Sequence, residues 1–280
     1  MGSSWAINSD LSPWSPPKAG SIFMGNAMTN SLNGRVALIT GASRGLGRET
    51  ALRFASAGAA VALLDRKAHW ADDLVTQIEA AGGKAIALGC DVSDRAALTA
   101  AFDSAAAALG GIDIVVNNAM WTKYAAIEDI DEESLDRMLG VGIAGIIWGT
   151  QAAAAAMRAR GGGSIINIAS VSAHLGLPNA MVYCGVKAAV EGMTRSSAIE
   201  LAPEGIRVNA VAPSTVATEG VRAMLDEATF AARVASTPLG RLGETSDIAE
   251  AVLFFADPAR SGFVTGQSLL VDGGISIALR

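Results

Sequence analysis

Short apolar runs alternate with longer segments of helical periodicity from residue 34 to the end of the chain. The runs are apolar at nearly every position rather than at every second one, which is typical of strands covered on both faces of a parallel sheet. Strands are expected at 35–40, 60–65, 84–90, 112–117, 163–170, 206–212 and 268–273. Helices are expected near 46–57, 71–81, 95–109, 134–159, 182–202 and 245–256.

Repeated alternation of strand and helix predicts βαβ units with right-handed crossovers. The fold class is therefore α/β, with a single doubly wound parallel sheet of seven strands and helices on both faces. The sequence contains no internal repeat or linker after residue 34, so 34–280 is expected to be one domain. Residues 1–33 are rich in Ser, Pro, Asn and Gly and are expected to form a flexible N-terminal arm.

Composition narrows the function classes. Hydrophobic residues make up 51% of the 280 residues and charged residues 17%, which is enough apolar material for a large core. A net charge of −6 without any Lys/Arg cluster argues against a nucleic-acid or membrane-surface protein. No run of 18 apolar residues lacks polar breaks, so no membrane-spanning helix is expected. Two cysteines fit a reducing, cytoplasmic location, and two distant histidines predict no metal site.

The segment "ITGASRGLGRE" follows the first expected strand and opens the first helix. Gly41, Gly45 and Gly47 would allow a tight turn and a close approach of the backbone to a pyrophosphate. The amides at the start of the helix would then face the anion. The spacing is G-x-x-x-G-x-G and does not meet the G-x-G-x-x-G pattern. A role in packing alone is the alternative.

Asp65 ends the second expected strand, where a carboxylate would bind a ribose diol and repel a 2′-phosphate. Two unit charges 4 Å apart interact by about 4 kcal/mol at an effective dielectric constant near 20. Arg44 and Arg66 lie nearby in the sequence, and either could pair with a phosphate. The carboxylate favours NAD over NADP. A solvated acid at the end of a strand is the alternative for Asp65.

The segment "YCGVK" places Tyr183 four residues before Lys187, on one face of an expected helix. A free tyrosine has a pKa near 10, so ionisation at pH 7 to 8 requires about 3 to 4 kcal/mol of stabilisation of the phenolate. A cation about 5 Å away supplies about 3 kcal/mol at an effective dielectric constant of 20. Tyr183 could then act as a general acid and base. The alternative is an ordinary surface pair on a helix.

These motifs together resemble those of the short-chain dehydrogenase/reductase family. "TGASRGLG" (40–47) is similar to its TGxxxGxG turn, "NNAM" (117–120) to its NNAG, "CDVSD" (90–94) to its adenine-binding stretch, and "GFVTGQSLLVDGG" (262–274) to its last strand. "YCGVK" resembles its YxxxK, with Ser170 thirteen residues ahead of the tyrosine. The resemblance extends from about residue 34 to the end of the chain.

The resemblance implies a Rossmann-type fold with a cofactor half, about 34–160, and a catalytic and substrate half, about 161–280. It implies a homotetrameric NAD(H)-dependent oxidoreductase that interconverts a secondary alcohol and a ketone by hydride transfer. Ser170, Tyr183 and Lys187 would be catalytic. The implied cofactor-binding residues are Gly41, Ser43, Arg44, Gly45, Leu46, Gly47, Asp65, Arg66, Asp91, Val92, Asn118, Ala119, Tyr183, Lys187, Pro213, Val216 and Thr218.

Three positions depart from the family pattern. Gly142 stands where the family carries an asparagine that opens the helix and holds a water linking the lysine to solvent, Met120 replaces the glycine of NNAG, and Ser214 stands where the family often has glycine. Two alternatives therefore remain open. One is an NADPH-dependent ketoreductase, decided by Arg44 and Arg66. The other is a catalytically weak dinucleotide-binding or scaffold protein, suggested by Gly142.

Residues 219–237 are expected to form a mobile segment over the substrate pocket. Apolar side chains there and near Tyr124 would line a cavity with few polar groups. The candidate substrate-binding residues are Trp121, His174, Met181 and Met224. The predicted substrate is a secondary alcohol or ketone, cyclic or aromatic, rather than a highly charged metabolite. The same apolar side chains could instead belong to the core. Asn117 is expected either to support the sheet or to contact the cofactor.

Overall fold

The computed structural model describes residues 31–278. The predicted N-terminal arm therefore lies outside the described residues up to residue 30. Leu32 is fully buried, and its N–H donates to the carbonyl oxygen of Ala57 at 3.0 Å. Packing of the domain thus begins two residues before the expected boundary at Gly34.

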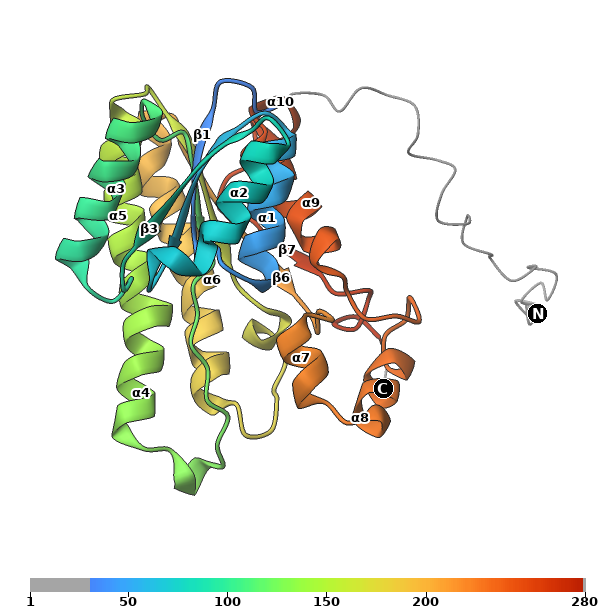
Figure 1. Ribbon diagram of the computed structural model, residues 1–280. Coiled ribbons are helices and arrows are strands. Elements are labelled where there is room, and N and C mark those ends of the chain that lie inside the picture. Colours follow the sequence, from blue (N-terminus) through green and yellow to red (C-terminus); the bar gives the residue numbers. More distant parts are fainter. Residues whose placement is uncertain (1–30, 279–280) are drawn as a thin grey trace, which may run out of the picture.

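A parallel sheet of seven strands runs through the centre of the molecule, with the order β3-β2-β1-β4-β5-β6-β7 (Figure 1). Its strands are β1 (Val36–Thr40), β2 (Ala60–Asp65), β3 (Lys84–Gly89), β4 (Ile114–Asn117), β5 (Gly163–Ile168), β6 (Ile206–Pro213) and β7 (Ser268–Val271). The central strands β1 and β4 are buried at every residue, as their continuous apolar runs predict. The fold class expected from the sequence is confirmed.

Two layers of helices cover the two faces of this sheet. On one face, α1 (Gly45–Ser56), α2 (Asp72–Ala80) and α9 (Thr245–Ala256) bury side chains such as Phe54, Leu74 and Val252 against the strands. The other face is covered by α3 (Arg95–Leu109), α5 (Gly145–Arg158) and α6 (Met181–Leu201). These helices bury side chains such as Phe102 and Met157 against the strands. Figure 1 shows both layers, with the sheet between them.

The helix expected at 134–159 is continuous but not regular. It consists of α4 (Glu132–Leu139), one turn of π-helix at Gly140–Ala144, and α5. By length and composition alone, Glu132–Arg158 could cross a membrane. The sequence predicted no such helix, because polar residues interrupt its apolar runs. In the fold its second half packs on α3 and the sheet, with Ala153 and Met157 fully buried. It is therefore a layer helix of this domain.

The segment expected over the pocket, residues 219–237, forms two short helices, α7 (Glu219–Met224) and α8 (Glu227–Ala235). The side chain of Thr218 accepts from the amide of Val221, and that of Asp226 from the amide of Thr229, so each helix has an N-cap. Both helices follow the carboxyl end of β6 and lie at the lower end of Figure 1. The last helix, α10 (Pro258–Ser261), precedes β7.

Candidate active site

The glycine turn after β1 needs all three of its glycines. Gly41 and Gly45 have φ of +65° and +57°, a region that favours glycine. A Cβ added at Gly47 would lie 2.2 Å from the carbonyl oxygen of Gly41, so no side chain fits there. No side chain caps the start of α1. The first amides of this helix are therefore left to a ligand or to water, which is the arrangement that binds pyrophosphate.

Asp65 lies directly against this turn. Its Oδ2 accepts hydrogen bonds from the amide and hydroxyl of Ser43 at 3.2 and 2.6 Å, and its Oδ1 accepts from the amide of Arg66 at 2.8 Å. The Arg66 guanidinium is directed toward Asp91, with Nε 3.9 Å from Oδ2. Hydrogen bonds from Ser93, and then the charge of Arg66, hold the pKa of the Asp91 carboxyl below its ordinary value. The carboxylate of Asp65 is therefore part of the glycine turn rather than a solvated acid at an isolated strand end.

The two asparagines that end β4 have different roles. Asn117 is buried, and its Nδ2 donates to Oδ1 of Asn167 at 2.9 Å, so it supports the sheet. Nδ2 of Asn118 donates to the carbonyl oxygens of Thr40 and Gly41 at 2.8 and 3.1 Å. The amide of Ala119 donates to the Thr40 hydroxyl at 3.0 Å. Asn118 and Ala119 thus hold the loop after β4 against the glycine turn.

The segment after β6 closes the other side of this edge. Val216 pairs with Gly243 in an isolated β-bridge, and Pro213 is the last residue of β6. A Cβ placed on Gly45 would lie 3.8 Å from Cγ2 of Thr218, so the start of α7 reaches the glycine turn. Buried Val92, with 8% of its surface exposed, follows β3, and Leu46 packs on the core below the turn. The structure thereby gathers the predicted cofactor-binding residues at one edge of the sheet.

The three predicted catalytic residues come together beside this edge. Ser170 follows β5, and its side chain lies near enough to Tyr183, in the first turn of α6, to lower the pKa of the phenol. Lys187 is 5% exposed, and its Nζ donates to the carbonyl oxygen of Ile168 at 2.7 Å. Nζ lies 5.7 Å from the centre of the Tyr183 ring. Serine, tyrosine and lysine therefore share one site at the carboxyl ends of the strands.

Burial controls the proton affinities of this group. It raises the pKa of Tyr183 to about 12, against the opposing effect of Ser170. It also lowers the pKa of Lys187 to about 8. In the ligand-free protein, desolvation is therefore the largest effect on the phenol and favours its neutral form. Ionisation of Tyr183 with the help of Lys187 and an oxidised nicotinamide ring stays a prediction.

Aromatic side chains from the loop after β4 reach this site. The Tyr124 ring meets the Tyr183 ring edge-on, with centroids 5.7 Å apart, and is 44% exposed. Trp121 lies under the guanidinium of Arg137, 4.4 Å from the ring centre. Met181 is 63% exposed. The side chain of Met224 lies outside the described part of the structure.

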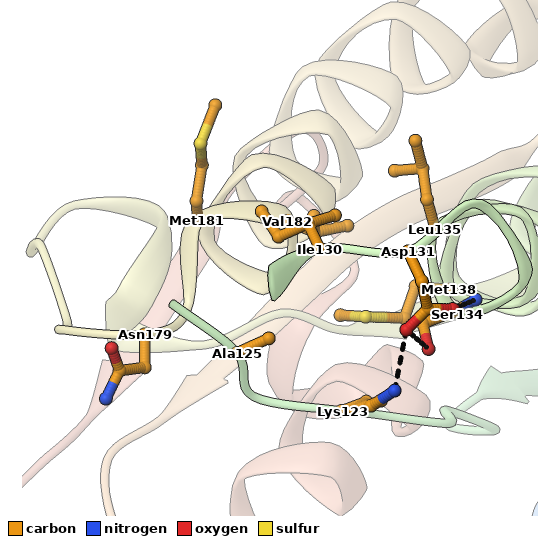
Figure 2. Close-up of a pocket in the computed structure, with 10 residues that line it drawn as sticks. All are labelled: Lys123, Ala125, Ile130, Asp131, Ser134, Leu135, Met138, Asn179, Met181 and Val182. Carbon is orange, nitrogen blue, oxygen red and sulfur yellow. Dashed lines mark hydrogen bonds and ion pairs between the residues drawn. The ribbon is translucent and has the colours of Figure 1, made fainter. Parts of the chain in front are cut away.

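A small pocket separates this loop from α4 and the start of α6 (Figure 2). Nζ of Lys123 lies 2.6 Å from Oδ2 of Asp131, which also accepts from the Ser134 hydroxyl at 2.9 Å. The amide of Ala125 donates to the carbonyl oxygen of Asn179 at 2.9 Å. These contacts fix the loop that carries Trp121 and Tyr124, and Figure 2 shows the ion pair beside Met138.

His174, predicted to bind substrate, is held by a residue that the sequence did not single out. Its Nε2 lies 2.9 Å from Oε1 of Glu191, which also accepts from the Ser268 hydroxyl at 2.6 Å. Glu191 is 5% exposed and follows Lys187 by one helical turn. Glu191 lies eight residues after Tyr183 and four after Lys187, so its spacing could have placed it on the same helix face as these two residues. A contact between His174 and a substrate stays a prediction.

Arg233 was also missed, because α8 was expected to contribute apolar residues. Its Nη1 donates to the Thr215 hydroxyl at 2.9 Å, next to the site. Gly142 lies in the π-helical turn, and a Cβ added there would be 2.5 Å from Cγ1 of Val186 and 3.0 Å from Sδ of Met120. The volume of an asparagine side chain is therefore filled. Among residues 31–278 no cluster of His, Cys, Asp and Glu could hold a metal ion.

Comparisons with known proteins agree with this geometry. The profile of the family described as Enoyl-(Acyl carrier protein) reductase matches residues 41–276. The 2-(S)-hydroxypropyl-CoM dehydrogenase 3 of Xanthobacter autotrophicus is 36% identical over 254 residues, which cover 89% of this chain and 99% of the relative.

Two solved structures are similar to the whole domain. A short-chain type dehydrogenase/reductase from Mycobacterium marinum has a TM-score of 0.84 and 38% identity, covering 89% of this chain and 98% of its own. A 7 alpha-hydroxysteroid dehydrogenase complexed with NADH and 7-oxo glycochenodeoxycholic acid has a TM-score of 0.85 and 35% identity, covering 90% and 98%. The fold, the glycine turn and these matches agree: the chain belongs to the short-chain dehydrogenase/reductase family.

Proposed function

We propose that this protein is an NAD(H)-dependent oxidoreductase that interconverts a secondary alcohol and a ketone. The observation that carries the proposal is the convergence of Ser170, Tyr183 and Lys187 beside the uncapped start of α1. Ligands of doubly wound sheets bind at this edge, beyond the carboxyl ends of the strands. The names of two relatives, a hydroxypropyl-CoM dehydrogenase and a hydroxysteroid dehydrogenase, are consistent with a secondary alcohol as substrate.

The turn after β1 fits a dinucleotide. A Cβ at Gly47 would meet the carbonyl oxygen of Gly41, so no side chain is accommodated there. The amides at the start of α1, which no side chain caps, would face the pyrophosphate. Asp65 would accept hydrogen bonds from the adenosine ribose, in exchange for one of those from Ser43. The same carboxylate would repel a 2′-phosphate, which supports NAD over NADP. Arg44 is exposed at the turn and motivates the NADPH-dependent alternative.

In the proposed reaction, Ser170 holds the substrate oxygen beside Tyr183. During oxidation the hydroxyl proton of the alcohol passes to the Tyr183 phenolate, and during reduction Tyr183 returns a proton to the oxygen of the former ketone. Bound NAD supplies the acceptor of the hydride that leaves the carbinol carbon. Lys187, fixed by the carbonyl oxygen of Ile168, favours the phenolate electrostatically.

A screen of secondary alcohols with NAD, followed by the absorbance of the reduced cofactor, tests the proposal. We expect Tyr183→Phe to lower turnover at least about 100-fold, the usual contribution of a general acid–base group. The variant should still bind NADH, because the glycine turn and Asp65 are intact in it. Tyr124→Phe is the matched control, since it removes a neighbouring hydroxyl and keeps the ring contact.

Three results would argue against the proposal. Unchanged turnover in Tyr183→Phe would exclude tyrosine acid–base chemistry. NADPH binding as tight as NADH, or tighter, would favour the ketoreductase alternative. A folded protein that binds NADH but oxidises no member of a broad panel would favour the scaffold alternative suggested by Gly142.

A further inference from the structure

Arg233 extends from α8 to the loop that follows β6. Its Nη1 donates to the Thr215 hydroxyl at 2.9 Å. Thr215 belongs to the segment 215–217, which is fixed by hydrogen bonds to Gly243. The guanidinium is partly buried, so its position is set by the fold rather than by free rotation in solvent.

The charge of Arg233 also acts on the opposite wall of the site. It lowers the pKa of the Tyr124 phenol, against the larger effect of burial, which raises it. The Tyr124 ring in turn meets the catalytic Tyr183 ring edge-on, at 5.7 Å between centroids. Arg233 thus contacts the loop after β6 and lies close enough to Tyr124, in the loop after β4, for its charge to act there.

This arginine has no acidic partner in the part of the chain that the structure describes. The ion pairs among residues 31–278 involve nine other Arg or Lys side chains and His174, and not Arg233. Its one hydrogen bond, to Thr215, uses one of the five N–H donors of a guanidinium. By comparison, the partly buried Arg160 forms two hydrogen bonds to the buried carboxylate of Asp113. A fixed, partly desolvated guanidinium with free donors is suited to a carboxylate.

We propose that Arg233 anchors an anionic group of the substrate, so that the substrate is a secondary alcohol or ketone bearing a carboxylate. This inference rests on the function proposed above and names its substrate class. It adds one charged group to the substrate expected from the sequence, which was a secondary alcohol or ketone rather than a highly charged metabolite. The pyrophosphate of the cofactor is also an anion that a guanidinium could bind. The experiment below distinguishes a substrate carboxylate from this pyrophosphate.

The test compares secondary hydroxy acids of increasing length, beginning with 3-hydroxybutyrate, with their methyl esters. Binding is measured by titration into protein saturated with NADH, and turnover is measured with NAD. The unmodified protein should prefer the best acid over its ester by about 10- to 100-fold, the range expected of hydrogen bonds to a charged group. Arg233→Gln should lose this preference mainly through a higher KM for the acid, with little change for the ester.

Two matched variants complete the design. Arg233→Lys keeps the charge and should retain part of the preference. Arg222→Gln removes a neighbouring cation that lies 5.6 Å from the Phe230 ring centre, and should leave the preference intact. The affinity of Arg233→Gln for NADH, measured by fluorescence, should equal that of the unmodified protein.

Other outcomes would overturn the inference. An equal loss for acid and ester in Arg233→Gln would assign Arg233 a structural role. Weaker NADH binding without a change in acid preference would assign it to the cofactor. No acid preference in binding by the unmodified protein would also reject it. Because binding is measured separately, an absence of turnover throughout the panel would count against the proposed reaction and not against the anion site.

Discussion

At the scale of the residue, burial rather than charge decides how the catalytic groups bind protons. Tyr183 and Lys187 are adjacent on α6, as their spacing predicted, yet desolvation raises the pKa of the phenol and lowers that of the amine. The spacing predicted that the two groups meet. It could not predict the sign of these shifts, because they depend on strands and loops distant in the sequence.

Lys187 should make stability depend on pH in a defined window. Its pKa is lowered from 10.5 to about 8 in the folded state, so between these values the unfolded chain binds more protons. The free energy of unfolding should therefore rise with pH, by about 1 kcal/mol per pH unit at most. Below pH 8 the lysine is charged in both states, and the full cost of its burial is present.

Urea unfolding of the unmodified protein and of Lys187→Met between pH 8 and 10 measures this effect. The stability of the unmodified protein relative to the variant should increase with pH. Cys90, whose pKa burial raises to about 11, contributes in the opposite direction above pH 9 but is common to both proteins. Lys123→Met, at an exposed position, should give a constant difference over this range. A constant difference for Lys187→Met would contradict the assignment.

Candidate residues in contiguous motifs could be found from the sequence, and those that act across the fold could not. The glycine turn and the Tyr183–Lys187 pair need only local spacing. Glu191 and Arg233 become significant only through His174 and Thr215, which other elements bring to them. Asn118 was expected to contact the cofactor, but its amide also binds the carbonyl oxygens of the turn.

At the scale of the element, the π-helical turn at Gly140–Ala144 separates α4 from α5. Periodicity predicted one helix here, since a single extra residue in a turn leaves the apolar pattern almost unchanged. Gly142 lies within this turn, against Val186, the residue before Lys187. The resemblance implied that Gly142 lacks the amide with which the family asparagine holds a water. In the structure Met120 and Val186 fill the place of that side chain. The local packing thus depends on the absence of a side chain at 142.

Gly142→Ala should therefore destabilise the protein by about 1 to 3 kcal/mol, because its Cβ would lie 2.5 Å from Cγ1 of Val186. Val186→Ala removes that methyl group, so the double variant should recover part of the loss. Chemical unfolding of the four proteins measures the coupling between the two positions.

Gly140→Ala is the matched control in the same turn. Its added Cβ would meet only Cβ of Ser93, at 3.4 Å, so it should cost little. If Gly142→Ala and Gly140→Ala were equally stable, or if the two substitutions at 142 and 186 were additive, the packing argument would be wrong.

At the scale of the whole molecule, the strand order explains the position of the site. β1 lies between β2 and β4, so the chain reverses its direction across the sheet after β3. The crevice outside the strand ends at such a point is where doubly wound folds bind ligands. The apolar runs predicted all seven strands, and the predicted ends lie within two residues of the observed ones. The order of the strands was not predicted, because the partners of a strand are set by long-range packing and not by the periodicity.

We propose that the outer edge of the sheet at β7 is a place where subunits of the expected homotetramer meet. β7 is the last strand in the sheet, and an unpaired edge strand is an exposed site for association. Phe263, just before it, is fully exposed, and Ile199 near the end of α6 is 80% exposed. The two segments that carry them meet at Gly266 and Ala198, since a Cβ added at Gly266 would lie 3.5 Å from Cβ of Ala198. We expect these exposed apolar side chains to be covered by a neighbouring subunit.

Light scattering should therefore give a mass near that of four chains of 28.4 kDa each. Phe263→Asp combined with Ile199→Asp should lower the mass, because each buried carboxylate would lose its hydration at the interface. Ile127→Asp, at a 72% exposed position in the loop after β4, is the control and should not change the mass. A single-chain mass for the unmodified protein would contradict the tetramer. An unchanged mass in the double variant would show that the β7 edge is not where the subunits meet.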